Sequence, residues 1–290
     1  MRVQRRTKSR TGALVLGAPS AVLLVVLLVL PLLTIARESF EPFYAGRIGS
    51  TGGGLTLANY AQLLSPTYLL YFYDTFRIGL IASILSVLIA YPVAYMIATQ
   101  TRPLRRKIYL TLFVTLMFLS VLARVYSIAL TFSPIGFLHP LAGWLGVSPN
   151  SYTIAQVLVV LGLMHLIIPI ATLTLIGALQ NINPRLLEAA QSLGCPKWRA
   201  HLSVTLPLSA PSAVSAFVIG YALCVSAFVI PMILGKGRVL FVSNLVFNRF
   251  SEIANFPGGS AIAIVLLMAM LVLVWGISAG LHRLANAGGR

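Results

Sequence analysis

The chain has 290 residues, of which 58% are hydrophobic and only 9% are charged. Soluble globular domains carry about 25% charged residues, so this composition excludes an ordinary water-soluble domain. The formal net charge is +16, but the basic residues flank apolar runs and form no nucleic-acid recognition motif. We therefore expect a membrane protein that sits in the lipid bilayer and binds no nucleic acid.

Six apolar runs are long enough to cross a bilayer core of about 30 Å as helices. In chain order they are Leu14–Ile35, Phe76–Ala98, Ile108–Phe132, Ile154–Leu175, Ala210–Leu234 and Ala261–Leu281. Strands of a membrane β-barrel would alternate apolar and polar residues, and these runs do not. The expected fold class is an all-α integral membrane protein with six transmembrane helices.

The first run follows a basic tail and therefore has to be distinguished from a cleavable signal peptide. It is longer than the apolar part of such a peptide, although Thr34-Ile35-Ala36 weakly matches a cleavage site. We expect this run to stay in the protein as its first transmembrane helix. The predicted division is a basic tail (1–13), the first helix (14–35), an external loop (36–75), a five-helix core (76–283) with a polar insert (183–207), and a tail (284–290).

The basic residues are distributed unevenly among the segments that connect the runs. Fourteen of the 21 Lys and Arg residues lie in the N-terminal tail, the second connection, the polar insert and the C-terminal tail. Six are counted to the other side, with Arg77 at the outer start of the second run, and Arg124 lies inside the third run. Because Lys and Arg are enriched in cytoplasmic loops, we expect both termini and the insert to be cytoplasmic.

The polar insert lies between the fourth and fifth runs and predicts a short helix. Asn183 is a good N-cap, Pro184 suits the first helical position, and Gly194 can end the helix in a left-handed turn. One side would carry Leu186, Ala189, Ala190 and Leu193, and the other Arg185, Glu188, Gln191 and Ser192. From this pattern alone, either a helix lying on lipid headgroups or a docking element for another protein remains open.

If the protein is a transporter, the positions of its acidic residues indicate its source of energy. Secondary transporters usually carry ionisable groups inside their spans, whereas all five acids lie outside the six runs: Glu38, Glu41, Asp74, Glu188 and Glu252. No phosphate-binding loop motif is present either. A transporter of this kind would take its energy from a partner at the cytoplasmic face.

The cysteines and histidines suggest no site of their own. Cys195 and Cys224 are expected in different compartments, which argues against a disulfide. The four histidines (His139, His165, His201 and His282) have no second ligand at a spacing that predicts a metal. We expect no metal, no cofactor and no catalytic residue in this chain.

The insert resembles the EAA loop of binding-protein-dependent ABC importer permeases. Glu188-Ala189-Ala190, Gly194 and Leu206-Pro207 follow its pattern, with Val204 in place of the usual isoleucine. The similarity to spermidine/putrescine-type permeases extends over most of the chain, through Leu55–Tyr60, Tyr91–Tyr95, Arg124–Tyr126, Phe228–Gly235 and Arg238–Phe250.

This resemblance implies a type I ABC importer fold of the MetI-like class, located in the bacterial inner membrane. Two permease subunits, here expected to be different chains, would form the passage. Two cytoplasmic ABC ATPase subunits would bind ATP and Mg, and an external solute-binding protein would deliver the cargo. The chain itself would then be no enzyme, because ATP hydrolysis takes place on its partner.

The resemblance also implies candidate sites. Contact with the ATPase would involve Glu188, Ala189, Ala190, Leu193, Gly194, Pro196 and Trp198. Candidates for the passage are Arg124, Tyr126, Ser212, Ser215, Tyr221 and Ser226, and those for an external gate or binding-protein contact are Asn244, Asn248 and Arg249.

Two of these assignments have structural alternatives. The small-residue stripe Ser212, Ser215, Ala222 and Ser226 fits close helix packing as well as a passage. Arg124 could instead extend toward the outer surface, or pair with Asp74 or with a partner subunit.

The nature of the cargo is less determined. The resemblance favours a polyamine, although a cation would prefer a passage with acidic or aromatic groups, and Ala227 stands where some polyamine permeases carry an acid. Opines, amino-acid derivatives and aminophosphonates remain open. Remoter alternatives are an ion channel, a secondary transporter and a membrane-embedded enzyme. The sequence shows no filter-like loop for a channel, no acid in a span for a secondary transporter, and no convergent reactive residues for an enzyme.

Overall fold

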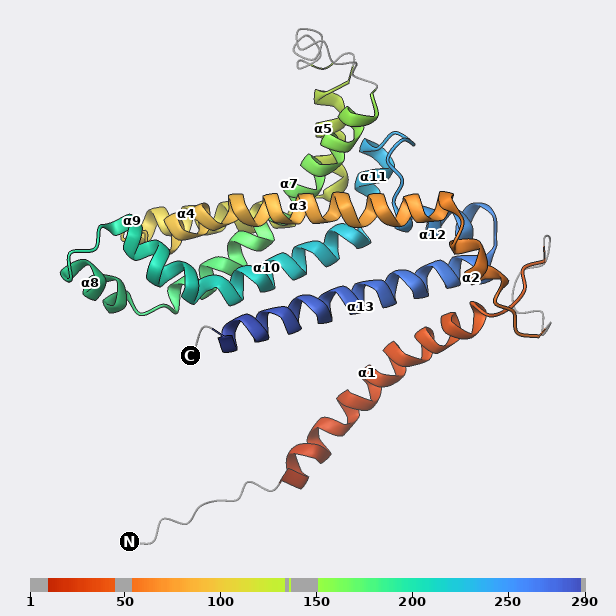
Figure 1. Ribbon diagram of the computed structural model, residues 1–290, viewed down its shortest axis with the longest axis horizontal. Helices are drawn as coiled ribbons and strands as arrows, with labels where there is room; N and C mark the ends of the chain where they lie inside the picture. The colour runs from red at the N-terminus through yellow and green to blue at the C-terminus, as the bar shows by residue number, and fades with distance from the viewer. Residues whose placement is uncertain (1–9, 45–53, 134–135, 137–150, 288–290) are drawn as a thin grey trace.

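The computed structural model describes residues 10–44, 54–133, 136 and 151–287, and within these ranges it consists of helices and loops without a strand (Figure 1). In chain order the elements are α1 (Arg10–Glu38), α2 (Ala58–Leu63), α3 (Pro66–Ala98), α4 (Pro103–Phe118), α5 (Val121–Thr131), α7 (Tyr152–Gln180), α8 (Pro184–Ser192), α9 (Lys197–Ala200), the π-helix η1 (His201–Thr205), α10 (Leu206–Ser226), α11 (Val229–Leu234), α12 (Val242–Phe247), the π-helix η2 (Asn248–Glu252) and α13 (Phe256–Ala287). The expected all-α fold is confirmed.

Several of these helices are long and apolar enough to cross a membrane. Within the described residues, four qualify: α3, α7, the continuous helix from α9 through η1 to α10, and α13. A fifth candidate is the bent pair of α4 and α5. Helix α1 encloses the first predicted run, so all six predicted runs fall on helical segments, two of which are interrupted.

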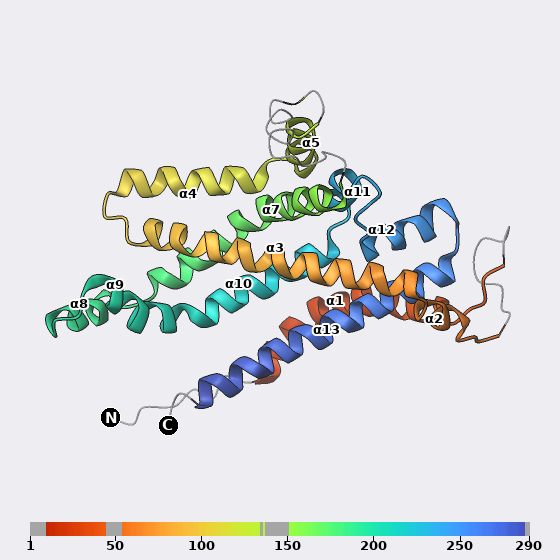
Figure 2. The same cartoon turned by 45° about the horizontal axis from the view of Figure 1, so that its top comes forward.

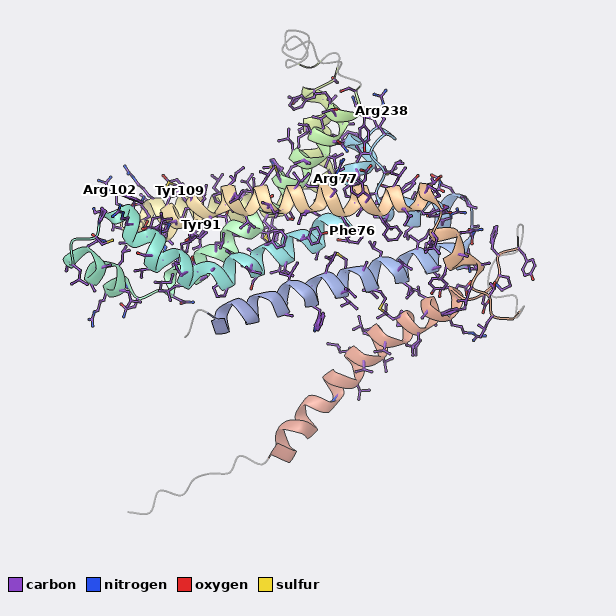
Figure 3. The ribbon with its side chains drawn as sticks, viewed as in Figure 1. Phe76, Arg77, Tyr91, Arg102, Tyr109 and Arg238 are labelled. Atoms are coloured by element: carbon purple, nitrogen blue, oxygen red, sulfur yellow. The ribbon has the colours of Figure 1, made fainter. Side chains whose placement is uncertain are left out.

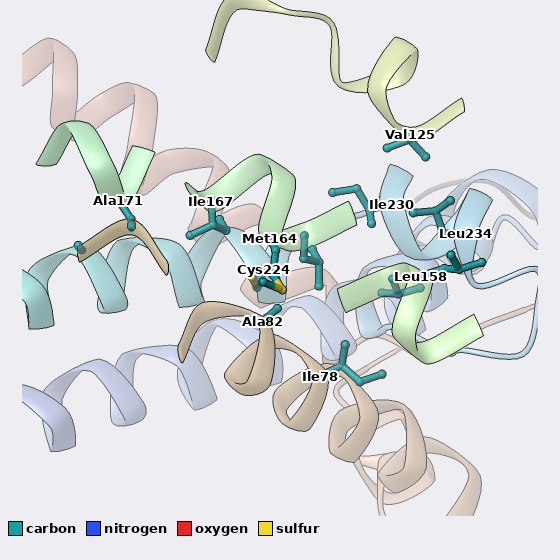
Figure 4. Packing of buried hydrophobic residues seen from close by; sticks show 14 of the residues in the cluster. Ile78, Ala82, Val125, Leu158, Met164, Ile167, Ala171, Cys224, Ile230 and Leu234 are labelled. Atoms are coloured by element: carbon teal, nitrogen blue, oxygen red, sulfur yellow. The ribbon is translucent and has the colours of Figure 1, made fainter. Parts of the chain in front are cut away.

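The core lies where α3, α7 and α10 pack together (Figure 4). The buried face of α3 carries small residues at successive turns: Gly79, Ala82, Ser83, Ser86, Ala90 and Ala94. Small side chains let neighbouring helices approach closely, and the hydroxyls of Ser83 and Ser86 donate to carbonyls of their own helix at 2.7 Å. The large members of the core, such as Ile78, Leu163 and Ile167, fill the space that this close approach leaves.

Gly162 on α7 shows how tightly α11 is packed against this core. A Cβ at this position would lie 2.6 Å from Cδ1 of Leu234 and 2.9 Å from Cγ2 of Ile230, and both of these residues are buried. We expect Gly162→Ala to lower the free energy of unfolding by about 1–3 kcal/mol through overpacking. Gly177 lies on the same helix with open space around it, so Gly177→Ala should be neutral or slightly stabilising. Thermal unfolding in detergent compares the two variants, and equal unfolding temperatures would contradict this account of the packing.

The third predicted run is not one straight helix. Its two halves, α4 and α5, meet at an angle of 89°, because the backbone at Leu119 and Ser120 is extended. Arg124 lies at this bend and is 7% exposed. Its guanidinium donates to the Leu119 carbonyl at 2.8 Å and to the His165 carbonyl on α7 at 3.4 Å. The prediction of one continuous span was therefore wrong.

Of the alternatives for Arg124, pairing with Asp74 is not observed. Asp74 is buried on α3, where its carboxylate accepts a hydrogen bond of 2.8 Å from the Tyr152 hydroxyl. Arg77, one helical turn further along, lies 3.4 Å from the same carboxylate and stacks over the ring of Tyr73. Asp74 thus has its own partners, and α3 begins at Pro66, ten residues before the predicted start at Phe76.

The fifth predicted run is also interrupted. Helix α10 ends at Ser226 and α11 begins at Val229, because Ala227 adopts an extended conformation. Two carbonyl groups at this break accept hydrogen bonds from α12. Ser243 donates its hydroxyl to the Ala227 carbonyl at 2.6 Å, and Asn244 donates its amide to the Phe228 carbonyl at 3.0 Å.

The elements at the two ends of the molecule differ. The α8–α9 segment and the α3–α4 turn lie at one end, toward which the end of α13 points, and α2 and α12 lie toward the other end (Figures 1 and 2). The end that carries α8 is named the coupling end below, and the other the opposite end. Among the described residues, the coupling end carries the basic residues of the α3–α4 turn and of the α8–α9 segment: Arg102, Arg105, Arg106, Lys107, Arg185, Lys197 and Arg199.

Candidate coupling site and cavity at the opposite end

Helix α8 forms from local signals that the sequence contains. The side-chain oxygen of Asn183 accepts a hydrogen bond of 3.0 Å from the Arg185 N–H, and Pro184 occupies the first helical position, where no N–H is needed. The predicted helix 184–193 is observed as Pro184–Ser192. The N-cap prediction for Asn183 is confirmed.

The other end of α8 closes in a left-handed turn at Gly194. Its φ is +85°, its N–H donates to Gln191 at 2.9 Å, and the Cys195 N–H donates to Ala190 at 3.2 Å. These two bonds are those of a Schellman motif, which pairs the last free carbonyls of a helix. The predicted left-handed conformation of Gly194 is confirmed, and α8 is a unit fixed at both ends.

The surface of α8 is not covered by the rest of the described chain. No residue of the helix is buried, Glu188 and Ala189 are exposed, and Ala190 is half-buried. Leu193 is 90% exposed and Trp198 is 59% exposed, with the guanidinium of Arg199 over the indole ring. Large apolar side chains exposed beside a carboxylate form a surface suited to protein contact.

A continuous helix leads from this surface into the core. It begins at Lys197 after the N-cap Pro196 and runs through the π-helical turn of η1 to Ser226. Leu206 and Pro207 lie inside this continuous helix. A π-turn at His201–Thr205 accommodates Pro207, which has no N–H to donate to the preceding turn.

Aromatic contacts hold the π-turn against α3. The His201 ring lies 4.1 Å from the Tyr95 ring, and the Tyr91 hydroxyl is 2.8 Å from Oγ of Ser209. Figure 3 shows Tyr91 together with Arg102 at the coupling end. The surface around α8 is therefore connected to α3 and α10 through contacts on both sides of the turn.

A cavity of about 320 Å³ lies at the opposite end, between α3, α11 and the segment of α12 and η2. Its lining includes the predicted gate residues Asn244 and Asn248, three aromatic residues and one carboxylate: Tyr71, Phe228, Phe247 and Glu252. The Asn248 amide donates to the Glu252 carboxylate. Arg249 is not part of the lining, because its guanidinium binds the hydroxyl of Tyr68 and lies over that ring.

The predicted passage residues do not share one environment. Tyr126, Ser215 and Ser226 are exposed, and Ser212 is half-buried. The face of α10 that packs on α3 and α7 carries Ser209, Ala216, Gly220 and Cys224 instead, so the predicted serine stripe is not the packing face. Tyr221 is 4% exposed and lies inside the α3–α10 contact, where its hydroxyl is 3.4 Å from the Phe76 carbonyl. Of the passage candidates, Tyr221 and Arg124 are thus buried within this chain.

The sequence analysis did not identify some of the residues that form these sites. Ser243 and Tyr152 act by contacting distant carbonyl and carboxylate groups, which no local pattern signals. Glu252 is different, because its spacing of four residues from Asn248 places both on one side of a helical segment. That spacing would have added a carboxylate to the predicted gate.

Comparison with known proteins agrees with this arrangement. Residues 90–283 match the sequence family described as binding-protein-dependent transport system inner membrane component. The chain is 31% identical over 258 residues to the spermidine/putrescine transport system permease protein PotB of Haemophilus influenzae, an alignment that covers 88% of this chain and 87% of that protein. It is 26% identical over 224 residues to PotB of Escherichia coli, which covers 76% of this chain and 81% of the relative.

A solved structure shares the fold. A bacterial alginate ABC transporter in complex with an alginate pentasaccharide-bound periplasmic protein matches with a TM-score of 0.75 over 93% of each chain, at 16% identity. This likeness confirms the fold of an ABC importer permease. Since the family match spans most of the chain, the protein belongs to the binding-protein-dependent inner-membrane components of transport systems, as a multi-pass permease subunit.

Proposed function

We propose that this permease pairs with a second, different permease chain and is driven by two cytoplasmic ATPase subunits that bind ATP and Mg. The carrying observation is α8, a helix capped at both ends, with Glu188 exposed on it, Leu193 exposed directly after it and Trp198 exposed on the neighbouring α9. A rigid element of this kind can transmit force from a partner protein. We propose Ala189, Ala190 and Pro196 as further parts of this contact.

The orientation proposed is with both termini and α8 in the cytoplasm. The support is that the basic residues of the α3–α4 turn and of the α8–α9 segment lie together at the coupling end, and that Lys and Arg favour the cytoplasmic side. Cys195 beside α8 offers a test, because Cys224 is fully buried. A membrane-impermeant maleimide should label Cys195 only after the cells are opened, and labelling of Cys195 in intact cells would contradict this orientation.

The proposed coupling route follows one continuous helix. Lys197–Ser226 spans 30 residues, which corresponds to about 45 Å at 1.5 Å per residue. One end adjoins α8, and the other ends at the break beside the cavity at the opposite end. Movement of α8 would therefore tilt this helix and shift Ala227 and Phe228 against Ser243 and Asn244. In this way closure of the ATPase pair would change access at the external side.

For the cargo we propose a polyamine, the class named for both PotB relatives. The cavity at the opposite end supports this proposal, because Glu252 and the rings of Tyr71, Phe228 and Phe247 suit a cation. Some polyamine permeases carry an acid where this chain has Ala227. Here the carboxylate of Glu252, which lines the cavity, would supply the negative charge instead. The external binding protein would deliver the polyamine to this surface.

The cargo proposal is tested by uptake of labelled spermidine and putrescine into proteoliposomes that contain the complete transporter and its binding protein. Glu252→Gln should raise the concentration needed for half-maximal uptake about threefold to fivefold, because it removes one exposed attractive charge. Glu252→Asp keeps the charge and should stay near the wild-type value. Binding of an opine or an aminophosphonate, but of no polyamine, to the cognate external protein would overturn the polyamine assignment.

A further inference from the structure

The π-helix η2 carries a cation and a carboxylate three residues apart, beside the cavity at the opposite end. Its turn is closed by the Ile253 N–H, which donates to the Asn248 carbonyl at 3.0 Å, five residues back. Arg249 follows Asn248, and Glu252 lines the cavity. Side chains three residues apart on a helical segment are neighbours, and opposite charges at this spacing attract each other. The spacing alone therefore predicts an ion pair between Arg249 and Glu252.

The structure gives both residues other partners. The Arg249 guanidinium donates a hydrogen bond to the Tyr68 hydroxyl on α3 and lies over the same ring, 5.7 Å from its centroid. Glu252 is exposed, and its Oε2 accepts a hydrogen bond from the Asn248 amide. Within the described part of the chain, Arg249 and Glu252 form no ion pair with each other or with another group. The carboxylate thus keeps its charge for a ligand from outside the chain.

Tyr68 attracts Arg249 in two ways. Its hydroxyl oxygen accepts a hydrogen bond from a charged donor, which is stronger than a bond between neutral groups. The face of its ring attracts the same cation. Both side chains are half-buried, and Tyr68 is held by packing on the apolar cluster of the opposite end, which contains Leu63, Val242 and Ile262. Water screens such a contact less than it screens an ion pair with the exposed Glu252, so Arg249 stays with Tyr68.

We infer that Tyr68 is a positioning residue for the cation site: it holds Arg249 away from Glu252 and so keeps the carboxylate available to a cationic cargo. This inference rests on the proposed function, in which Glu252 attracts the cation. Tyr68 itself is not part of the cavity lining, whereas Tyr71, one helical turn further along α3, is part of it. Without Tyr68, the guanidinium of Arg249 can turn to Glu252 and neutralise it, and the cargo then meets an ion pair in place of a free acid.

The test measures the spermidine concentration for half-maximal uptake in proteoliposomes that contain the complete transporter and its binding protein. Tyr68→Leu removes both attractions and should raise this concentration about threefold to fivefold, as Glu252→Gln should, because both changes cancel the same exposed charge. Tyr68→Phe keeps the ring and should have a smaller effect. Tyr68→Leu combined with Arg249→Gln should return close to the wild-type value, since no cation is then left to neutralise Glu252. A role in folding alone predicts no such rescue.

Tyr60→Leu is the matched control, because Tyr60 packs on the same apolar cluster but its hydroxyl lies 2.7 Å from Oγ of Ser39. It should leave the half-maximal concentration unchanged. Equal effects of the two leucine variants, or no rescue by Arg249→Gln, would overturn the inference. If Glu252→Gln alters uptake and Tyr68→Leu does not, this inference fails and the proposed cargo site stands. If Glu252→Gln has no effect, the proposed cargo site is wrong and the inference fails with it.

Discussion

Replacing Gly194 by valine is expected to reduce cargo uptake by a factor of about 5–30 while the transporter still assembles and hydrolyses ATP. The residue has a φ of +85°, and a β-branched side chain in this conformation costs about 1–2 kcal/mol. That cost shifts the equilibrium between the closed and the frayed end of α8 by a factor of about 5–30. A frayed α8 no longer transmits movement to the helix that begins at Lys197. Uptake and ATP hydrolysis, measured on the same proteoliposomes, separate coupling from assembly.

Gly54 provides a matched control for this variant. It has a φ of +81° and, like Gly194, no atom within 4 Å of the position that a Cβ would take, but it lies in the loop before α2. Gly54→Val therefore introduces the same backbone strain far from α8. Its uptake should stay within about twofold of the wild type. Equal losses in the two variants, or wild-type uptake by Gly194→Val, would contradict the assignment of α8 to coupling.

The sequence was sufficient for the parts of the structure that local rules determine. An N-cap Asn183, a Pro184 at the first turn and Gly194 after the last one predict α8 without any distant contact. The apolar runs predict helices in the same way, because hydrocarbon leaves the backbone few alternatives. These predictions concern neighbouring residues, which is why the structure confirms them.

The sequence was insufficient where distant groups decide the backbone. The bend at Leu119 and Ser120 has neither Pro nor Gly to mark it, and it depends on Arg124 reaching a carbonyl of His165, 41 residues away. The break at Ala227 likewise depends on Ser243. Periodicity also leaves open which side of a helix packs. On α10 the packing side carries Ala216 and Gly220, not the serine stripe that the sequence made attractive.

The bend in the third span leads to a second large expected effect. Arg124→Ala should lower the unfolding temperature of the purified permease by about 5–10 °C, at about 2–4 °C for each kcal/mol lost. The reason is that the variant leaves the partly buried carbonyls of Leu119 and His165 without this donor, and an unpaired carbonyl costs up to about 1–3 kcal/mol when it is shielded from water. Loss of the packing made by the arginine stem adds to this cost. Thermal unfolding in detergent, followed by circular dichroism, measures the change.

Two further variants separate this role from a direct one in transport. Arg124→Lys keeps one donor for the Leu119 carbonyl and should fall between the wild type and the alanine variant. Arg105→Ala removes a charge from an exposed site on α4 and should leave the unfolding temperature unchanged. If Arg124 instead contacted the cargo in the passage, its alanine variant would unfold like the wild type and lose uptake alone. Because the guanidinium is buried between α5 and α7, we expect the alanine variant to lose stability. Any loss of uptake would then be a consequence of that loss of stability.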